Sequence, residues 1–332
     1  SLAAGFVVYH SVLSTSHAGF EPAALLEREK RTVAYSHLRD PRIIEPIQSG
    51  RERWERYRKN GLFDELHVYS RFGLRLVGFY WPRDRNPGDR NPRGSARSFI
   101  PPVAHSPERT VIIIHALMDS SSGMAYLAEA YHELGWNVLS IDLRAHGESD
   151  GKHRTMGVRE AQDLSLWVDL LVSRYKIRNL YLHGVSMGGA VCLLYGANKK
   201  ILNGAVRGII ADSSYSNCAE VLQRLLESIV TSPFLARTIR FGANLISILY
   251  TGVSFGMMNP ERKTHTIPVP LLLFHGQKDV LIPIGSARKL FSRAVKPSDE
   301  MVVVPEAQHA GAFFYANELY MQKIQNFVRR IE

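Results

Sequence analysis

From residue 111 onward, short runs of apolar, β-branched residues alternate with longer amphipathic stretches. The run at 111–114 is fully apolar, which is typical of a strand buried on both faces of a parallel sheet. Further strands are predicted at residues 137–141, 179–183, 206–212, 269–274 and 300–304. Helices are predicted at residues 123–134, 158–174 and 187–197, with a closing helix through Val328. This alternation predicts an α/β protein with a mainly parallel sheet that helices cover on both faces.

The N-terminal part of the chain follows a different pattern. Residues 21–60 are polar and helix-prone, and Trp54 and Tyr57 are expected to face inward from a solvated, arginine-rich helix. Apolar and polar residues alternate across residues 64–81 around a short turn, which predicts an antiparallel hairpin. Residues 83–102 combine Pro, Gly, Asn and Arg, and this composition predicts a long exposed loop.

An insertion at about residues 213–263 separates two of the predicted strands and is too long for an ordinary connection in such a sheet. Its sequence predicts two helices, at 218–229 and 234–250. The second is apolar almost all round, and its only charges are Arg237 and Arg240. Such a helix is expected to be covered or to cover something. We therefore predict a helical cap over the carboxyl edge of the sheet, inserted before the penultimate strand.

A G-x-S-x-G motif, Gly184-Val185-Ser186-Met187-Gly188, lies directly between a predicted strand and a predicted helix. A serine in this position sits on a tight, strained turn that lifts its hydroxyl above the sheet, and the flanking glycines let strand and helix backbones approach closely. The helix N-terminus adds free N–H groups beside a developing negative charge. Because of this context, the motif predicts a catalytic nucleophile at Ser186.

A serine hydroxyl is a weak nucleophile at neutral pH and needs a base, which in turn needs an orienting acceptor. Asp279 and His309 follow Ser186 in the order acid, then histidine, and each lies just beyond the end of a separate predicted strand. Loops at the carboxyl ends of parallel strands converge on one crevice. The sequence therefore predicts a triad of Ser186, Asp279 and His309.

Each of the two partner positions has rivals. Asp212 also ends a strand and is the alternative acid. His115, His146 and His183 lie at other strand ends or turns, and none of them follows Asp279, so hydrogen-bonded structural roles are expected for them. No metal-binding spacing such as H-E-x-x-H occurs, so neither a metal nor a cofactor is expected.

The negative charge on the substrate oxygen requires two N–H donors. One is predicted to be the N–H of Met187, the residue after the nucleophile, and the other to come from the loop at 115–119 after the first parallel strand. Leu117 is the preferred second donor, with Met118 as its competitor.

In these motifs the chain resembles serine hydrolases of the α/β-hydrolase superfamily. It is most similar to bacterial single-domain esterase-like members. One departure is an alanine where the family usually has glycine in the loop that supplies the second donor, which changes the local shape but not the triad. The resemblance covers roughly residues 64–331. The residues that carry it are His115-Ala116-Leu117, the turn Asp142-Leu143-Arg144-Ala145-His146-Gly147-Glu148-Ser149, residues 184–189, Asp279 and His309.

The resemblance implies acyl transfer to water by a carboxylesterase. We expect two regions: an N-terminal helical extension over residues 1–60 and an α/β-hydrolase domain over residues 61–332, which includes the cap insertion. Apolar residues of the cap suggest a substrate with an apolar acyl or aromatic group. The alternatives are a thioesterase or peptidase with the same triad, or a non-catalytic membrane-associated binding protein of the same fold.

The composition bears mainly on partners. The 332 residues include 41 Lys and Arg against 31 Asp and Glu, a formal net charge of +10. The basic residues lack a nucleic-acid recognition motif, so no nucleic-acid partner is expected. Together with an apolar run at residues 2–8, which is too short to cross a bilayer, the charge suggests peripheral contact with an anionic membrane surface. Two hypotheses for localisation stay open: membrane association through a removed N-terminal anchor, or the cytoplasm.

Overall fold

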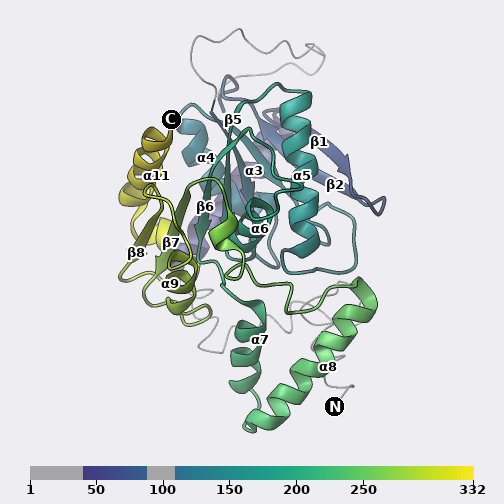
Figure 1. The fold of residues 1–332 in the computed structure, drawn as a ribbon. Helices are drawn as coiled ribbons and strands as arrows, with labels where there is room; N and C mark the ends of the chain where they lie inside the picture. Colours follow the sequence, from purple (N-terminus) through teal and green to yellow (C-terminus); the bar gives the residue numbers. More distant parts are fainter. Residues whose placement is uncertain (1–39, 88–108) are drawn as a thin grey trace.

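A computed structural model describes residues 40–87 and 109–332, in which eight strands form one sheet in the order β1-β2-β4-β3-β5-β6-β7-β8 (Figure 1). The pairs β1–β2 and β2–β4 are antiparallel, and all other neighbours are parallel. The prediction of a mainly parallel sheet is thus confirmed. The strands are β1 (Asp64–Tyr69), β2 (Arg75–Trp81), β3 (Arg109–Ile114), β4 (Asn137–Ile141), β5 (Asn179–Val185), β6 (Val206–Asp212), β7 (Leu271–Gly276) and β8 (Glu300–Val304).

Helices cover both faces of this sheet. The α-helices are α3 (Pro41–Lys59), α4 (Ala125–Glu133), α5 (Val158–Ser173), α6 (Met187–Gly196), α7 (Cys218–Glu227), α8 (Pro233–Thr251), α9 (Gly285–Phe291), α10 (Ala312–Tyr315) and α11 (Asn317–Ile331). The described residues also form the short 3-10 helices η2 (Ser121–Met124) and η3 (Thr264–Thr266). The arrangement confirms the predicted α/β class.

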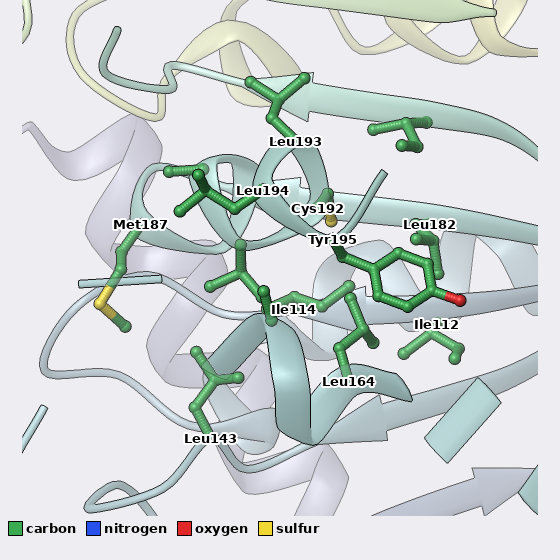
Figure 2. Packing of buried hydrophobic residues seen from close by; sticks show 14 of the residues in the cluster. Ile112, Ile114, Leu143, Leu164, Leu182, Met187, Cys192, Leu193, Leu194 and Tyr195 are labelled. Carbon is green, nitrogen blue, oxygen red and sulfur yellow. The ribbon is translucent and has the colours of Figure 1, made fainter. Parts of the chain in front are cut away.

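The alternation of side chains along each strand produces two apolar cores, one on each face of the sheet. In β3, Ile112 and Ile114 belong to the core shared with α5 and α6, and Figure 2 shows them packed among side chains of these helices. Val111 and Ile113 belong to the core shared with α3, α4 and α11. All four side chains are almost completely buried, as the fully apolar run predicts.

Several element boundaries differ from those predicted. Strand β7 begins at Leu271 rather than at 269, since Pro270 has no N–H to donate to a neighbouring strand. Strand β5 continues through Val185, so the nucleophile elbow follows it without an intervening loop residue. The helix before β4 begins with the 3-10 turn η2. Helices α9 and α10 were not predicted; α10 is only one turn long.

Helix α3 accounts for the described part of the N-terminal extension. Asp40 caps it, because its side chain accepts a hydrogen bond from the N–H of Arg42. Trp54 is 2% exposed and packs in the core, and Tyr57 contacts Trp81, so both aromatic residues face inward as predicted. The proposed division at residue 60 stays a prediction. The apolar run at 2–8 and most of the loop predicted at 83–102 lie outside the described residues.

Helices α7 and α8 form within the connection from β6 to β7 and extend away from the body of the sheet (Figure 1). Helix α8 is buried on one side only. Phe234, Phe241 and Leu249 on its other side are 80%, 60% and 80% exposed. The expectation that this helix is covered is therefore met on one side only. None of the helices formed by residues 40–87 and 109–332 combines the length and the apolar character that a membrane span needs. The role of α7 and α8 as a cap stays a prediction.

Candidate active site

The turn between β5 and α6 holds Ser186 in a strained backbone conformation, with φ 55° and ψ −114°. The surrounding glycines are required by close backbone contacts. A Cβ atom on Gly184 would lie 2.1 Å from the carbonyl oxygen of Gly188, and one on Gly188 would lie 2.1 Å from that of Ile114. The sequence therefore uses glycine on both sides of the serine because strand, helix and the neighbouring strand β3 meet there.

The structure brings together the three residues of the predicted triad. The Ser186 hydroxyl donates to Nε2 of His309 at 2.9 Å, and the Nδ1–H of His309 donates to Oδ2 of Asp279 at 2.7 Å. The other carboxylate oxygen of Asp279 accepts from the N–H of Ile282 at 2.8 Å, which fixes the carboxylate on its loop after β7. All three side chains are buried. This chain of hydrogen bonds can make the serine nucleophilic and stabilise a charged imidazole.

A second polar pair supports the turn that carries the histidine. Ala310 has a positive φ of 53°, and its N–H donates to Oγ of Ser213 at 3.0 Å. The Ser213 hydroxyl in turn donates to Oδ1 of Asp212 at 2.9 Å. Ser213 was not predicted as part of the site. Only its place one residue after a buried strand could have suggested it.

We expect Ser213→Ala to lower kcat about tenfold and leave KM nearly unchanged, because it removes the acceptor for Ala310 without touching a group that reacts. Steady-state kinetics on a p-nitrophenyl ester measure both values, and a thermal melt checks the fold. An unchanged kcat in a folded variant would contradict this role. Ser140→Ala is a suitable control, since that buried hydroxyl has no hydrogen-bond partner among the described residues.

The rival acid, Asp212, is engaged by groups other than the candidate base. Its Oδ2 accepts from the hydroxyl of Tyr320 at 3.0 Å and its Oδ1 from Ser213. Burial raises the pKa of Asp212 to about 6, partly offset by these hydrogen bonds. Because Nδ1 of His309 is directed to Asp279, the geometry favours Asp279 as the orienting acid and gives Asp212 a supporting place.

Two of the rival histidines make buried structural hydrogen bonds. Nε2 of His115 accepts from the N–H of Leu143 at 3.0 Å and joins the loops after β3 and β4. His183 lies between two tyrosines: it accepts from Tyr131 and donates to Tyr320, both at 2.9 Å. Burial lowers the pKa of His183 to about 3, so it stays neutral. The predicted structural roles of these residues agree with this geometry.

The turn at 142–149, which carries part of the family resemblance, is held by its own polar residues. Arg144 donates two hydrogen bonds of 2.6 Å to Asp163 on α5, and both side chains are buried. Burial raises the pKa of Asp163 to about 6, although the arginine opposes this shift. The third rival histidine, His146, shares a hydrogen bond at Nδ1 with the carbonyl of Arg144 at 2.9 Å. These contacts fix the turn against α5.

His275, in β7, was not considered as a site residue in the sequence. It is fully buried, and its Nε2–H donates to the carbonyl oxygen of Ile282 at 2.6 Å. The same nitrogen lies 3.4 Å from Oδ2 of Asp279. Burial lowers the pKa of His275 despite the nearby carboxylate, which keeps this side chain neutral. His275 therefore closes the loop that presents Asp279.

The predicted oxyanion donors lie on the expected elements. Met187 is the first residue of α6, where backbone N–H groups have no partner within the helix. The loop 115–119 follows β3, whose last residue, Ile114, touches the start of α6 at Gly188. Met118 has a positive φ of 61° and is 40% exposed. The choice of Leu117 over Met118 stays a prediction.

The apolar residues of the insertion fall into two groups. One group is buried in the same core as Met187, next to the nucleophile, and the other is exposed on the surface of the insertion. The buried group contains Ile246, Phe255 and Met258, and the exposed group contains Phe234, Phe241, Tyr250 and Met257. The apolar residues of the insertion thus divide between the core and the surface.

Comparison with known proteins agrees with this architecture. The family model described as "Serine aminopeptidase, S33" matches residues 105–231, which include the elbow. The chain is 29% identical over 229 residues to uncharacterized protein YqkD of Bacillus subtilis, covering 68% of this chain and 72% of that protein. It is 23% identical over 231 residues to a monoacylglycerol lipase of Mycolicibacterium smegmatis, covering 61% of this chain and 81% of the lipase.

Among solved structures, the esterase Pf2001 of Pyrococcus furiosus is similar in fold. Its TM-score is 0.63 at 21% sequence identity, and the match covers 83% of this chain and 95% of the esterase. The similar fold agrees with the order of the strands in the sheet, and the matched family model includes the nucleophile elbow. The chain therefore has the α/β-hydrolase fold, and its sequence is similar to the serine aminopeptidase family model over residues 105–231.

Proposed function

We propose that this protein hydrolyses carboxylic esters through a covalent acyl-enzyme intermediate, with Ser186 as nucleophile, His309 as base and Asp279 as orienting acid. The observation that carries the proposal is the continuous pair of hydrogen bonds from Ser186 through His309 to Asp279, at 2.9 and 2.7 Å. Its placement on a strained elbow at a helix N-terminus is the arrangement that acyl transfer requires.

The reaction proceeds in two halves. Ser186 Oγ attacks the ester carbonyl while Nε2 of His309 takes its proton, and the N–H groups of Met187 and Leu117 stabilise the resulting oxyanion. The C–O bond to the alcohol then breaks, and His309 returns the proton to the leaving oxygen. Water attacks the acyl-enzyme with His309 again as base, which releases the acid and restores the serine hydroxyl.

A fluorophosphonate probe tests the nucleophile directly. It should label the folded protein at Ser186 in peptide mapping, and prior thermal denaturation should prevent labelling, since the reactivity depends on the assembled triad. Absence of labelling in folded protein would favour the alternative of a non-catalytic membrane-associated binding protein. Labelling at another serine would contradict the assignment of Ser186.

We propose that the enzyme prefers ester substrates with an apolar acyl group. Ile246, Phe255 and Met258 share one core with Met187, so a pocket that opens beside the nucleophile would have apolar walls. The lipase and esterase activities named for the relatives also involve ester substrates.

In a p-nitrophenyl ester series, kcat/KM should rise with each added methylene from acetate until the pocket is filled, by up to about fourfold per methylene. Phe255→Leu should reduce this preference, because it alters the buried apolar group. Phe241→Leu is the matched control, since Phe241 is 60% exposed. A series in which acetate is the best substrate would contradict an apolar acyl pocket.

The main alternatives within the same chemistry are a thioesterase and a peptidase. A peptidase deserves a direct comparison because the matched family model carries the description of a serine aminopeptidase. Acyl thioesters and aminoacyl p-nitroanilides should be assayed beside the oxygen esters. A higher kcat/KM for either class would replace the carboxylesterase proposal while keeping the triad.

We also propose peripheral contact with an anionic membrane surface, which would bring the protein to lipid esters. The support is the formal net charge of +10, since basic residues near an anionic bilayer each contribute about 1 kcal/mol. Sedimentation with acidic liposomes should therefore weaken as salt increases.

A further inference from the structure

The exposed side of α8 is the most apolar helix face on the described surface of the insertion. Phe234 and Leu249, near its two ends, are each 80% exposed, and Phe241 at its centre is 60% exposed. Leu245 and Ile248 are 36% and 40% exposed. Exposure of these apolar side chains to water is unfavourable. A contiguous exposed apolar face of this kind is typical of a surface that binds an apolar partner.

Helical geometry places these five residues on one stripe. At about 100° per residue, Phe234, Phe241, Leu245, Ile248 and Leu249 fall within an arc of about 100°. The stripe runs from Phe234 to Leu249, so it extends along about 22 Å of the helix. We name this stripe the outer face of α8.

The opposite side of α8 accounts for the attachment of the helix to the rest of the protein. Ala236 and Ile239 pack with Leu226 of α7 in a small apolar cluster. Ala243 and Ile246 belong to the main core. Because these contacts already bury the inner side, the apolar residues of the outer face are not needed to hold the helix in place.

Positive charge borders the outer face. Arg237 lies about 40° from Phe241 around the helix, and Arg240 lies about 60° further on the same side. Helix α8 contains no Asp or Glu. Between α7 and α8, a cavity of about 450 Å³ is lined by these two arginines and Arg224, together with two glutamates, Glu220 and Glu227, and three uncharged residues. Glu220 is already paired with Lys289 at 2.7 Å.

We propose that the outer face of α8 is the surface by which the protein docks onto an anionic lipid bilayer. This inference rests on the proposed membrane contact and assigns it to one helix. The apolar side chains would enter the boundary between headgroups and acyl chains, which typically accepts an amphipathic helix to a depth of about 5–10 Å. The arginines at its border would meet lipid phosphates, to which guanidinium groups bind well.

A bilayer fits this face better than a second copy of the chain. Each copy has a formal net charge of +10, and α8 contains no acidic residue that could neutralise the arginines of a partner helix. An anionic bilayer supplies both an apolar interior and negative charge.

The test is flotation of the full chain with extruded vesicles of phosphatidylcholine, with and without phosphatidylglycerol. Ser186→Ala serves as the background, so that binding is measured without hydrolysis of lipid. The double variant Phe241→Ser and Leu249→Ser should weaken partitioning into anionic vesicles at least about tenfold. Val295→Ser is the control because Val295 is 68% exposed in the connection between α9 and β8, away from α8 in the sequence, and it should leave partitioning unchanged.

The charge contribution is tested separately. Arg237→Gln should weaken binding to anionic vesicles at low salt and have little effect on binding to neutral vesicles. Arg288→Gln on α9 is the matched control for loss of one exposed positive charge. Equal losses for both arginine variants would indicate general electrostatic attraction, which would overturn the assignment to α8.

Two further outcomes would overturn the proposal. Unchanged flotation of the double variant would exclude the outer face as the docking surface. A dimer in analytical ultracentrifugation that the double variant dissolves would identify a second copy as the partner. The failure of docking is distinguishable from failure of the proposed function, because a water-soluble p-nitrophenyl ester and the fluorophosphonate probe report on Ser186 without a membrane.

Discussion

Replacing Ser186 by alanine is expected to abolish ester hydrolysis, with a loss in kcat of at least about 10⁴-fold. The substitution removes the atom that forms the acyl-enzyme and leaves the oxyanion donors in place. The fold should persist, because alanine is smaller than serine and the side chain makes one described hydrogen bond, to His309. The measurements are p-nitrophenyl ester turnover, fluorophosphonate labelling and a thermal melt.

Ser140→Ala is the matched control for this prediction, since it also removes a hydroxyl from a fully buried serine, in β4. It should retain turnover and labelling. If Ser186→Ala kept most of the activity while remaining folded, Ser186 would not be the nucleophile and the proposed mechanism would be wrong.

Asp279→Asn is expected to lower kcat by about 10³- to 10⁴-fold. The amide oxygen can keep the hydrogen bond from the N–H of Ile282, so the loop should stay in place. Its NH₂ group then faces Nδ1 of His309 and donates to it, which places the imidazole proton on Nε2. In that tautomer the histidine cannot accept the proton of Ser186.

Asp212→Asn is the corresponding test of the rival acid. We expect it to lower kcat by less than about tenfold, because the amide oxygen can still accept from Ser213 and the burial that raises the pKa of Asp212 to about 6 already disfavours its charge. Both variants are assayed with the same ester and checked by thermal melts. A larger loss for Asp212→Asn than for Asp279→Asn would exchange the two assignments.

Local sequence patterns were sufficient to predict features that depend on a single strand or turn. The apolar run at 111–114 predicted β3 because every side chain in it is buried, and the glycines around Ser186 predicted the elbow because no larger residue fits between Gly188 and Ile114. The boundary of β7 was less accurate, since the apolar residue before Pro270 extends the pattern but not the hydrogen-bonded pairing.

Residues whose role depends on distant partners were not predictable in the same way. Ser213 supports Ala310 across 97 residues of sequence, and His275 contacts Asp279 only because β7 and its loop fold back. Arg144 belongs to the turn that carries the family resemblance, but its buried pairing with Asp163 of α5 depends on the tertiary structure. None of these contacts leaves a periodic signal along the chain.

The sequence by itself determined the α/β class, the nucleophile elbow and the order of Ser186, Asp279 and His309, because hydrophobic periodicity and glycine spacing are local properties. Only the tertiary structure decided which carboxylate faces His309 and which apolar residues of α8 remain exposed. Both depend on distances between segments far apart in the chain. The choice between Asp279 and Asp212 follows from a 2.7 Å hydrogen bond, and the outer face of α8 follows from which side of that helix the core covers.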